Sequence, residues 1–166
     1  MKHHWRYEKI LELEAASEKA AELKAQGKKI ITANGSFDIL HAGHLDLLEE
    51  ARQQGDVLFI GLNSDTSIKE EKGQIRPFIS EQERAAMLAA LICIDYVAII
   101  DASYDDLPSV FIKAIKPAVH VNGAEYGSPE TWVEYPAMQE VGAIGHAVER
   151  RPGLATTDLI KKIQSA

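Results

Sequence analysis

The chain has 166 residues, of which 46% are hydrophobic and 26% charged, and its formal net charge is -7. This length suits a single domain, and the acidic balance excludes broad binding to nucleic-acid backbones, which require a basic surface. No apolar stretch approaches the roughly 20 residues that a membrane span needs, and no signal peptide precedes the charged start. We therefore expect a cytoplasmic protein that binds neither membrane nor nucleic acid.

The N-terminal residues 1–27 are predicted to form a helical preface to the main unit, residues 28–166. Apolar residues recur at helical spacing from Ile10 to Ala25, and Gly27 ends the pattern. We expect this helix to cover an edge of the sheet that follows. Contact with a second copy of the chain is the alternative role for it.

A strand, a loop and a helix are predicted next. The apolar run Ile30–Ala33 breaks at Asn-Gly, and apolar residues return at helical spacing over 45–51. A helix that starts directly after a strand offers unpaired backbone N–H groups and a positive dipole end to an anion. His41 and His44, three residues apart, can donate hydrogen bonds to phosphate oxygens, and Gly43 lets a phosphate approach the backbone. The sequence therefore predicts a phosphate site at this helix start.

Two other interpretations of the histidine pair stay open. Histidines three residues apart can ligate a metal, but zinc sites generally need a third protein ligand, and the sequence does not fix one nearby. A histidine at a helix start can also be purely structural.

Strands and helices alternate along the rest of the chain. Strands are predicted over 56–61, 96–100, 118–121 and 143–148, and helices over 80–91, 105–115 and 131–141. Ser80 and Glu83 have the spacing of a capping box at one helix start. Together with Ile30–Ala33, these elements predict an α/β fold with a doubly wound five-stranded parallel sheet and helices on both faces. Within it, we expect Cys93 to be a buried, unreactive thiol and His120 to be structural.

Two motifs near opposite ends of the chain resemble the signatures of the HIGH-type nucleotidylyltransferases. His41-Ala-Gly-His44 is similar to HxGH, and Gly153-Leu-Ala-Thr-Thr157 is similar to Gly-x-Ser-Thr-Thr. Four further segments follow in the order seen in heptose 1-phosphate adenylyltransferases: Asn63-Ser-Asp65, Lys72-Gly73, Arg76-Pro77 and Glu81-Gln-Glu-Arg84. The resemblance runs from about Lys29 to Ile163, and it implies a Rossmann-like fold.

The resemblance also implies an activity and the residues that carry it. The reaction is transfer of a nucleoside monophosphate from ATP to heptose 1-phosphate, with release of pyrophosphate and with Mg²⁺ bound to the triphosphate, in lipopolysaccharide biosynthesis. The implied catalytic residues are His41, His44, Lys72 and Arg150. The implied nucleotide-binding residues are Gly35, Ser36, Phe37, Gly43, Asn122, Gly123, Glu125, Thr156 and Thr157, and the implied acceptor-binding residues are Asp38, Asn63, Asp65, Arg76 and Arg84. The segment from Lys69 to Arg76 is implied to be a mobile loop, and oligomers are common in the family.

Three positions depart from the family pattern. Asn122 replaces a Lys, Glu125 replaces an Asp, and Ala155 replaces the usual Ser of the second signature. Two alternatives therefore stay open: a CTP-dependent cytidylyltransferase that acts on glycerol 3-phosphate or phosphoethanolamine, and a nucleotide-binding regulator without turnover. Thr156 and Thr157 can bind phosphate or can simply cap their helix.

Overall fold

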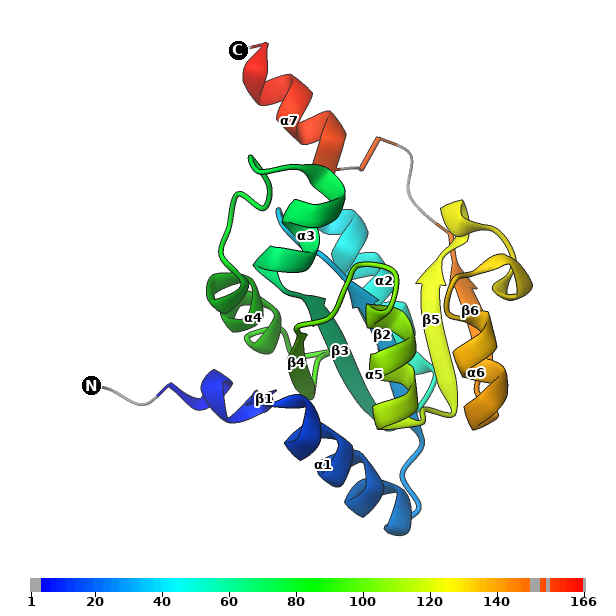
Figure 1. Cartoon of the computed structure of the whole chain (residues 1–166). Helices are drawn as coiled ribbons and strands as arrows, with labels where there is room; N and C mark the ends of the chain where they lie inside the picture. Colours follow the sequence, from blue (N-terminus) through cyan, green and yellow to red (C-terminus); the bar gives the residue numbers. More distant parts are fainter. Residues whose placement is uncertain (1–3, 150–152, 155, 166) are drawn as a thin grey trace.

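A computed structural model of the chain describes residues 4–149, 153–154 and 156–165. Over these residues the fold is one six-stranded, all-parallel sheet in the order β1-β4-β3-β2-β5-β6, with helices on both faces (Figure 1). The strands are β1 (Ile10–Leu11), β2 (Ile30–Gly35), β3 (Val57–Asn63), β4 (Tyr96–Ile100), β5 (Val119–Gly123) and β6 (Ile144–Val148). The α-helices are α1 (Leu13–Ala25), α2 (Ala42–Gln53), α3 (Asp65–Lys72), α4 (Glu81–Ala89), α5 (Leu107–Ile115), α6 (Tyr135–Val141) and α7 (Thr156–Gln164). The doubly wound α/β fold is confirmed.

The predicted number of five strands is wrong, because the N-terminal segment supplies a sixth. Ile10 and Leu11, predicted as the first turn of the helix, form the edge strand β1 and pair in parallel with Val97 and Ala98 of β4. The helix α1 begins only at Leu13. A strand of two residues is too short to show a period-2 pattern, so its apolar residues read as part of the helical stripe.

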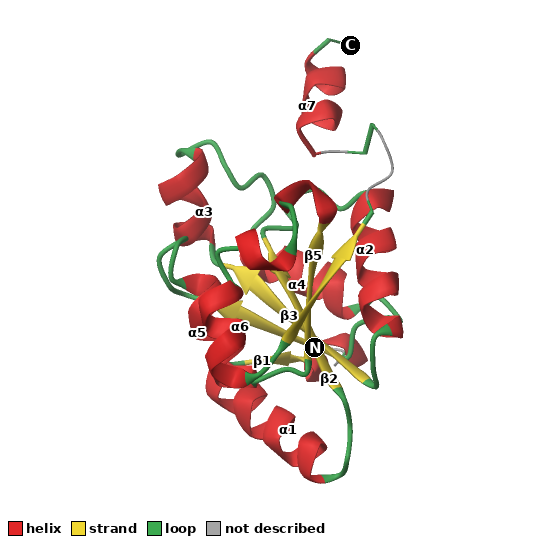
Figure 2. Ribbon diagram, turned by 90° about the vertical axis from the view of Figure 1, so that its right-hand side faces the viewer, coloured by secondary structure: helices red, strands yellow, loops and turns green. Residues whose placement is uncertain are grey.

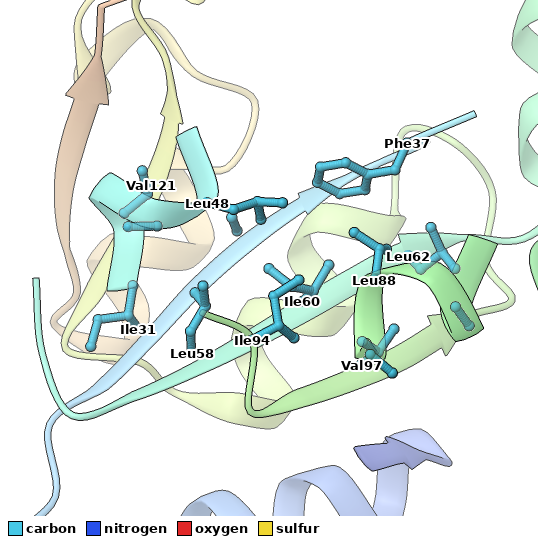
Figure 3. Close-up of a cluster of buried hydrophobic side chains, with 14 of the residues drawn as sticks. Ile31, Phe37, Leu48, Leu58, Ile60, Leu62, Leu88, Ile94, Val97 and Val121 are labelled. Carbon is cyan, nitrogen blue, oxygen red and sulfur yellow. The ribbon is translucent and has the colours of Figure 1, made fainter. Parts of the chain in front are cut away.

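Two hydrophobic cores lie on opposite faces of the sheet, beneath the helices that Figure 2 shows on either side of it. On one face, α2 and α4 contribute Leu48 and Leu88, which pack on Leu58 and Ile60 of β3 (Figure 3). On the other face, α1 and α5 pack on the alternate residues of the same strands, with Phe111 as a fully buried side chain. Helix α6 packs against α5 on this second face. A central strand that is buried on both faces explains why β3 reads as a continuous apolar run.

The order of the strands creates a switch point between β2 and β5. From β2 the chain moves outward in one direction through β3 and β4, and it then crosses back to place β5 on the other side of β2. Ligands in such sheets bind beyond the carboxyl ends of the strands at the switch point. In Figure 1, α3 and α7 lie beyond this edge of the sheet.

The segment predicted as a mobile loop is helical in its first half. Lys69 and Lys72 lie in α3, and only residues 73–80 form a loop between α3 and α4. The hydroxyl of Ser64 caps α3 by accepting the N–H of Ser67 at 3.1 Å. The capping box of Ser80 and Glu83 at the start of α4 is confirmed.

The side chain of Cys93 is partly buried. This burial raises the pKa of its thiol, which disfavours the reactive thiolate.

Among the described helices, none combines the length and the apolar character needed to cross a membrane.

We predict that His120 makes the stability of the fold fall below neutral pH. His120 of β5 is fully buried, its Nδ1 lies 2.9 Å from Thr32 Oγ1, and burial lowers its pKa to about 3. In the unfolded chain a histidine takes up a proton near pH 6.5, so the stabilisation is complete above that pH and is lost as the pH falls from about 6.5 towards 3. Urea unfolding at pH 7.5, 6.5, 5.5 and 4.5 should show a loss of up to about 1.4 kcal/mol per pH unit from this residue.

The control for this prediction is His120→Asn, which keeps a polar group near Thr32 but does not titrate in this range. The free energy of unfolding of the variant should fall less steeply below pH 6.5 than that of the wild type. Parallel slopes for the two proteins would contradict the assignment.

Candidate functional site

A cavity of about 310 Å³ opens at the carboxyl ends of β2, β5 and β6. It is lined by Asn34, Gly35, Ser36, Phe37, Asp38, Gly43, His44, Leu47, Lys72, Arg76, Val121, Asn122, Gly123, Glu125, Tyr126, Val148, Glu149, Thr156 and Thr157. The cavity therefore joins the start of α2, the end of α3 and the start of α7, which are far apart in the sequence. We call it the first cavity.

The start of α2 brings the two predicted histidines together. His41 is the N-cap residue, and its Nδ1 accepts the N–H of Gly43 at 3.1 Å. In its neutral form the His41 ring therefore carries its proton on Nε2. The rings of His41 and His44 are stacked, with centroids 3.9 Å apart, and His44 lines the cavity.

A tight turn after β2 aims the chain at this helix. Phe37 has a φ of 45°, a left-handed conformation that is uncommon for a residue with a side chain. Its ring is buried and meets the His44 ring edge-on at 5.3 Å between centroids. A Cβ at Gly35 would lie 3.2 Å from the Phe37 ring, which is a tight contact. The glycine therefore leaves room for the ring.

Gly43 has a second reason to be a glycine, besides the predicted approach of a phosphate. A Cβ at this position would lie 3.1 Å from the His41 ring and 3.2 Å from Cβ of Leu154. The absent side chain thus lets the capping imidazole and the segment before α7 pack closely around the helix start.

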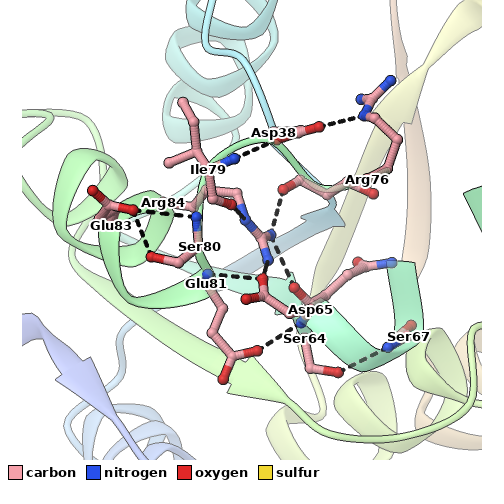
Figure 4. Close-up of polar contacts among 12 residues, drawn as sticks. Asp38, Ser64, Asp65, Ser67, Arg76, Ile79, Ser80, Glu81, Glu83 and Arg84 are labelled. Atoms are coloured by element: carbon pink, nitrogen blue, oxygen red, sulfur yellow. Dashed lines mark hydrogen bonds and ion pairs between the residues drawn. The ribbon is translucent and has the colours of Figure 1, made fainter. Parts of the chain in front are cut away.

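The carboxylate of Asp38 holds the loop between α3 and α4. It is 1% exposed, pairs with the guanidinium of Arg76, and accepts the N–H groups of Phe78 at 2.8 Å and Ile79 at 3.1 Å (Figure 4). Arg76 thereby reaches the cavity wall with its charge already paired.

The other cation of this wall comes from α3. Lys72 Nζ donates to Ser36 Oγ at 3.1 Å and lies 3.7 Å from Glu71 Oε2. Lys72 therefore lies directly over the turn that follows β2, where it can contact an anion bound at the start of α2.

Arg84 is fully buried and connects four segments (Figure 4). Its guanidinium and Nε donate to the carbonyls of Ile79 at 2.9 Å, Ser36 at 2.6 Å and Asn63 at 2.9 Å, and to Asp65 Oδ1 at 2.7 Å. Asp65 also accepts the N–H of Glu81 at 2.8 Å. Arg84 and Asp65, both predicted to bind the acceptor, lie outside the lining of the cavity and fix the position of its walls instead.

Residues of β5 and α7 complete the lining. Glu125 folds back over Gly123, where a Cβ would lie 2.1 Å from its Oε2. Thr156 and Thr157 enter the lining from the start of α7. The predicted catalytic Arg150 lies outside the described residues, as does Ala155.

A second cavity of about 300 Å³ adjoins the first. The predicted residue Asn63 lines this cavity, together with Tyr104, Trp132 and Glu134, which were not predicted. The sequence held one signal for Glu134, because Pro136 lies in the first turn of α6 and proline favours a helix start. The predicted helix over 131–141 hid this signal by placing Glu134 in its interior.

The charged groups of the first cavity bear on what it can bind. Asp38 is committed to Arg76, and the carboxylates of Glu125 and Glu149 also belong to the lining. Within the part of the chain that the structure describes, no three His, Cys, Asp or Glu side chains gather into a metal site. Lys72 and the helix start are the groups of this lining that can hold an anion.

Comparison with known proteins identifies a family. A family model described as cytidylyltransferase-like matches residues 32–165. The chain is 48% identical over 143 residues to the bifunctional protein HldE of Geobacter metallireducens, which covers 86% of this chain and 28% of that protein. It is 41% identical over 165 residues to the bifunctional protein HldE of Syntrophotalea carbinolica, and this match covers 98% of this chain and 33% of that protein. The chain thus spans about a third or less of the length of these relatives.

Solved structures with a similar fold agree with the parallel sheet. The lipopolysaccharide core biosynthesis protein from Thermoplasma volcanium superposes with a TM-score of 0.59 at 24% identity, covering 75% of this chain and 97% of that one. A pantoate-beta-alanine ligase from Francisella tularensis, complexed with beta-gamma ATP and beta-alanine, superposes with a TM-score of 0.62 at 13% identity. This match covers 95% of this chain and 78% of that one. At these identities the likeness concerns the fold.

We predict that Arg84→Met lowers the free energy of unfolding by about 3 to 5 kcal/mol, because it leaves Asp65 and three carbonyls without their donor. Lys113→Met is the matched control, since Lys113 pairs with Glu140 at 2.9 Å on the surface and exposed pairs contribute about 1 kcal/mol or less. Urea unfolding followed by circular dichroism measures both. Equal losses in the two variants would show that Arg84 has no special structural role.

Proposed function

The chain belongs to the cytidylyltransferase-like family, and from this we propose that it transfers the nucleoside monophosphate of ATP to a sugar phosphate, heptose 1-phosphate, with release of pyrophosphate. The observation that carries the proposal is the first cavity, where His44 of α2, Lys72 of α3 and Thr156 of α7 share one lining. These groups all suit a polyanion, and they correspond to the motifs that carry the family resemblance.

The reaction needs positioning and charge stabilisation more than covalent catalysis. An oxygen of the acceptor phosphate attacks the α-phosphorus in line, the bond from this phosphorus to the oxygen bridging to the β-phosphate breaks, and pyrophosphate leaves. A phosphate monoester is already an adequate nucleophile, so no enzyme-bound intermediate is required. The protein must hold the two substrates in line and stabilise negative charge on the phosphates.

The residues of the first cavity can divide this work. His44, with His41 stacked on it, would donate hydrogen bonds to the triphosphate at the start of α2. The first turn of α7, with Thr156 and Thr157, would bind the nucleotide from the opposite side. Lys72 would contact the phosphates from above the turn after β2, while Arg76 shapes the loop beside it.

Mg²⁺ would accompany the triphosphate. This ion usually binds through one or two carboxylates together with substrate phosphates and water, and the lining offers the carboxylates of Glu125 and Glu149. When bound, the ion neutralises charge on the phosphate oxygens. The protein side chains keep the roles given above.

A substrate screen tests the proposed reaction. Pyrophosphate release should be observed with ATP and heptose 1-phosphate, and it should exceed the release with CTP or with glycerol 3-phosphate or phosphoethanolamine as acceptor. Preference for CTP with one of the smaller acceptors would replace the proposed reaction with a cytidylyltransferase. Binding of nucleotide without turnover on any acceptor would indicate a regulator.

We predict that His44→Ala lowers turnover by about 100-fold or more, since removal of one preorganised donor to developing charge costs about 3 to 4 kcal/mol. His146→Ala is the control, because His146 is also partly buried but pairs with Glu50 at 2.8 Å away from the cavity. Steady-state pyrophosphate release measures turnover, and a thermal melt confirms that both variants fold. Turnover close to the wild-type value in His44→Ala would remove this residue from the reaction.

A further inference from the structure

The second cavity is continuous with the first but differs from it in charge. The two share Asn34, Gly35, Ser36, Asn122 and Tyr126 at the switch point between β2 and β5. The first carries Lys72, Arg76 and His44 beside the carboxylates of Asp38, Glu125 and Glu149, whereas the described lining of the second contains no Lys, Arg or His. It contains instead the carboxylates of Asp105 and Glu134. A phosphate group can therefore meet cations and a helix start in the first cavity, whereas the only charged side chains in the described lining of the second are carboxylates, which repel it.

Glu134 is a buried carboxylate on the wall of the second cavity. It is 4% exposed, and its burial raises the pKa of the carboxyl. Its Oε1 accepts a long hydrogen bond of 3.4 Å from Asn34 Nδ2. Its Oε2 is buried, and no described residue donates to it. A buried acceptor that is left unsatisfied destabilises the fold, so such a group calls for an explanation.

Two amide oxygens on the wall of the second cavity also lack a hydrogen-bond donor. Oδ1 of Asn34, at the end of β2, and Oδ1 of Asn63, at the end of β3, are buried without a hydrogen-bond donor among the described residues. The bond from Asn34 to Glu134 fixes which way the Asn34 amide points, with its nitrogen on the glutamate. Three acceptors from three separate elements thus border one cavity, and what they lack is donors.

We propose that the second cavity holds the uncharged, polyhydroxylated part of the phosphorylated acceptor, with Glu134 as the residue that determines specificity for it. Hydroxyl groups of a sugar would donate to Glu134, Asn34 and Asn63, while the phosphate of the same molecule lies towards the first cavity. This rests on the proposed function, because it places the acceptor beside the triphosphate. A sugar suits the wall because it carries several hydroxyl donors, and the wall offers three acceptors that come from β2, β3 and the segment before α6.

Glu134→Gln tests the proposal with little change of shape. The amide keeps an oxygen for Asn34 but replaces the acceptor Oε2 by a donor, which cannot accept a hydroxyl. At saturating ATP, the KM for heptose 1-phosphate should rise about 10-fold or more, the fold-change that corresponds to a lost hydrogen bond to a charged group. The KM for ATP, measured at saturating sugar phosphate, should change less than about twofold.

The matched control is Glu130→Gln, which removes a carboxylate four residues away on an exposed turn outside both cavities. It should leave both KM values unchanged, and thermal melts should show that both variants fold. A Glu134→Gln enzyme with an unchanged KM for heptose 1-phosphate, or with a raised KM for ATP alone, would overturn the proposal. Faster wild-type turnover of phosphoethanolamine than of the sugar phosphate, lost in Glu134→Gln, would also overturn it, because the carboxylate would then recognise a cation.

A binding experiment separates this proposal from the proposed function. Calorimetry with heptose 1-phosphate, in the presence of a non-hydrolysable ATP analogue, measures acceptor affinity in the wild type and in Glu134→Gln without turnover. An affinity loss of about 10-fold in the variant supports the sugar site even if the wild type releases no pyrophosphate, in which case only the proposed reaction fails. Equal affinity in both proteins overturns the sugar site whether or not the reaction occurs.

Discussion

The buried guanidinium of Arg84 is the interaction on which the geometry of the site depends. Removing a charge from water costs several kcal/mol unless hydrogen bonds and an opposite charge offset the loss. Arg84 meets this condition only if the turn after β2, the end of β3, the start of α3 and the start of α4 all lie where they do, because each supplies one acceptor. The hydrogen bond from Arg84 therefore fixes Ser36, whose hydroxyl accepts from Lys72. The precise shape of the first cavity is a consequence of satisfying one buried charge.

The two neighbouring cavities offer different groups to a ligand, and this difference follows from the topology of the sheet. At the switch point, the loops that follow β2 and β5 lead to opposite halves of the sheet. Loops from both halves therefore surround the space beyond the carboxyl ends of these two strands. The half that contains α2 and α3 contributes Lys72, Arg76 and a helix start. The segments that follow β4 and β5 contribute the carboxylates and aromatic rings of the second cavity. An elongated substrate with a charged end and a neutral end would match this arrangement.

Much of the fold could be predicted because its signals are local. The apolar run at Ile30–Ala33, the capping box at Ser80 and the glycine between two histidines each depend on residues that are close in sequence. The strand β1 was missed because two residues leave no periodicity. The second half of α3 was expected to belong to a loop because the family resemblance implied one from Lys69 to Arg76. Roles that depend on distant partners could not be predicted: the acceptors of Arg84 are mainly backbone carbonyls, and Glu134 meets Asn34 across 100 positions of the chain.

Helix α7 buries none of its described residues, although its first turn forms part of the wall of the first cavity. Hydrophobic packing therefore contributes little to keeping this turn in place. A nucleotide that bridges Thr156 and the start of α2 would itself supply much of the attachment, so part of its intrinsic affinity would be consumed in ordering the helix. Nucleotide binding would then hold helix α7 against the first cavity, and release of the product would remove this attachment.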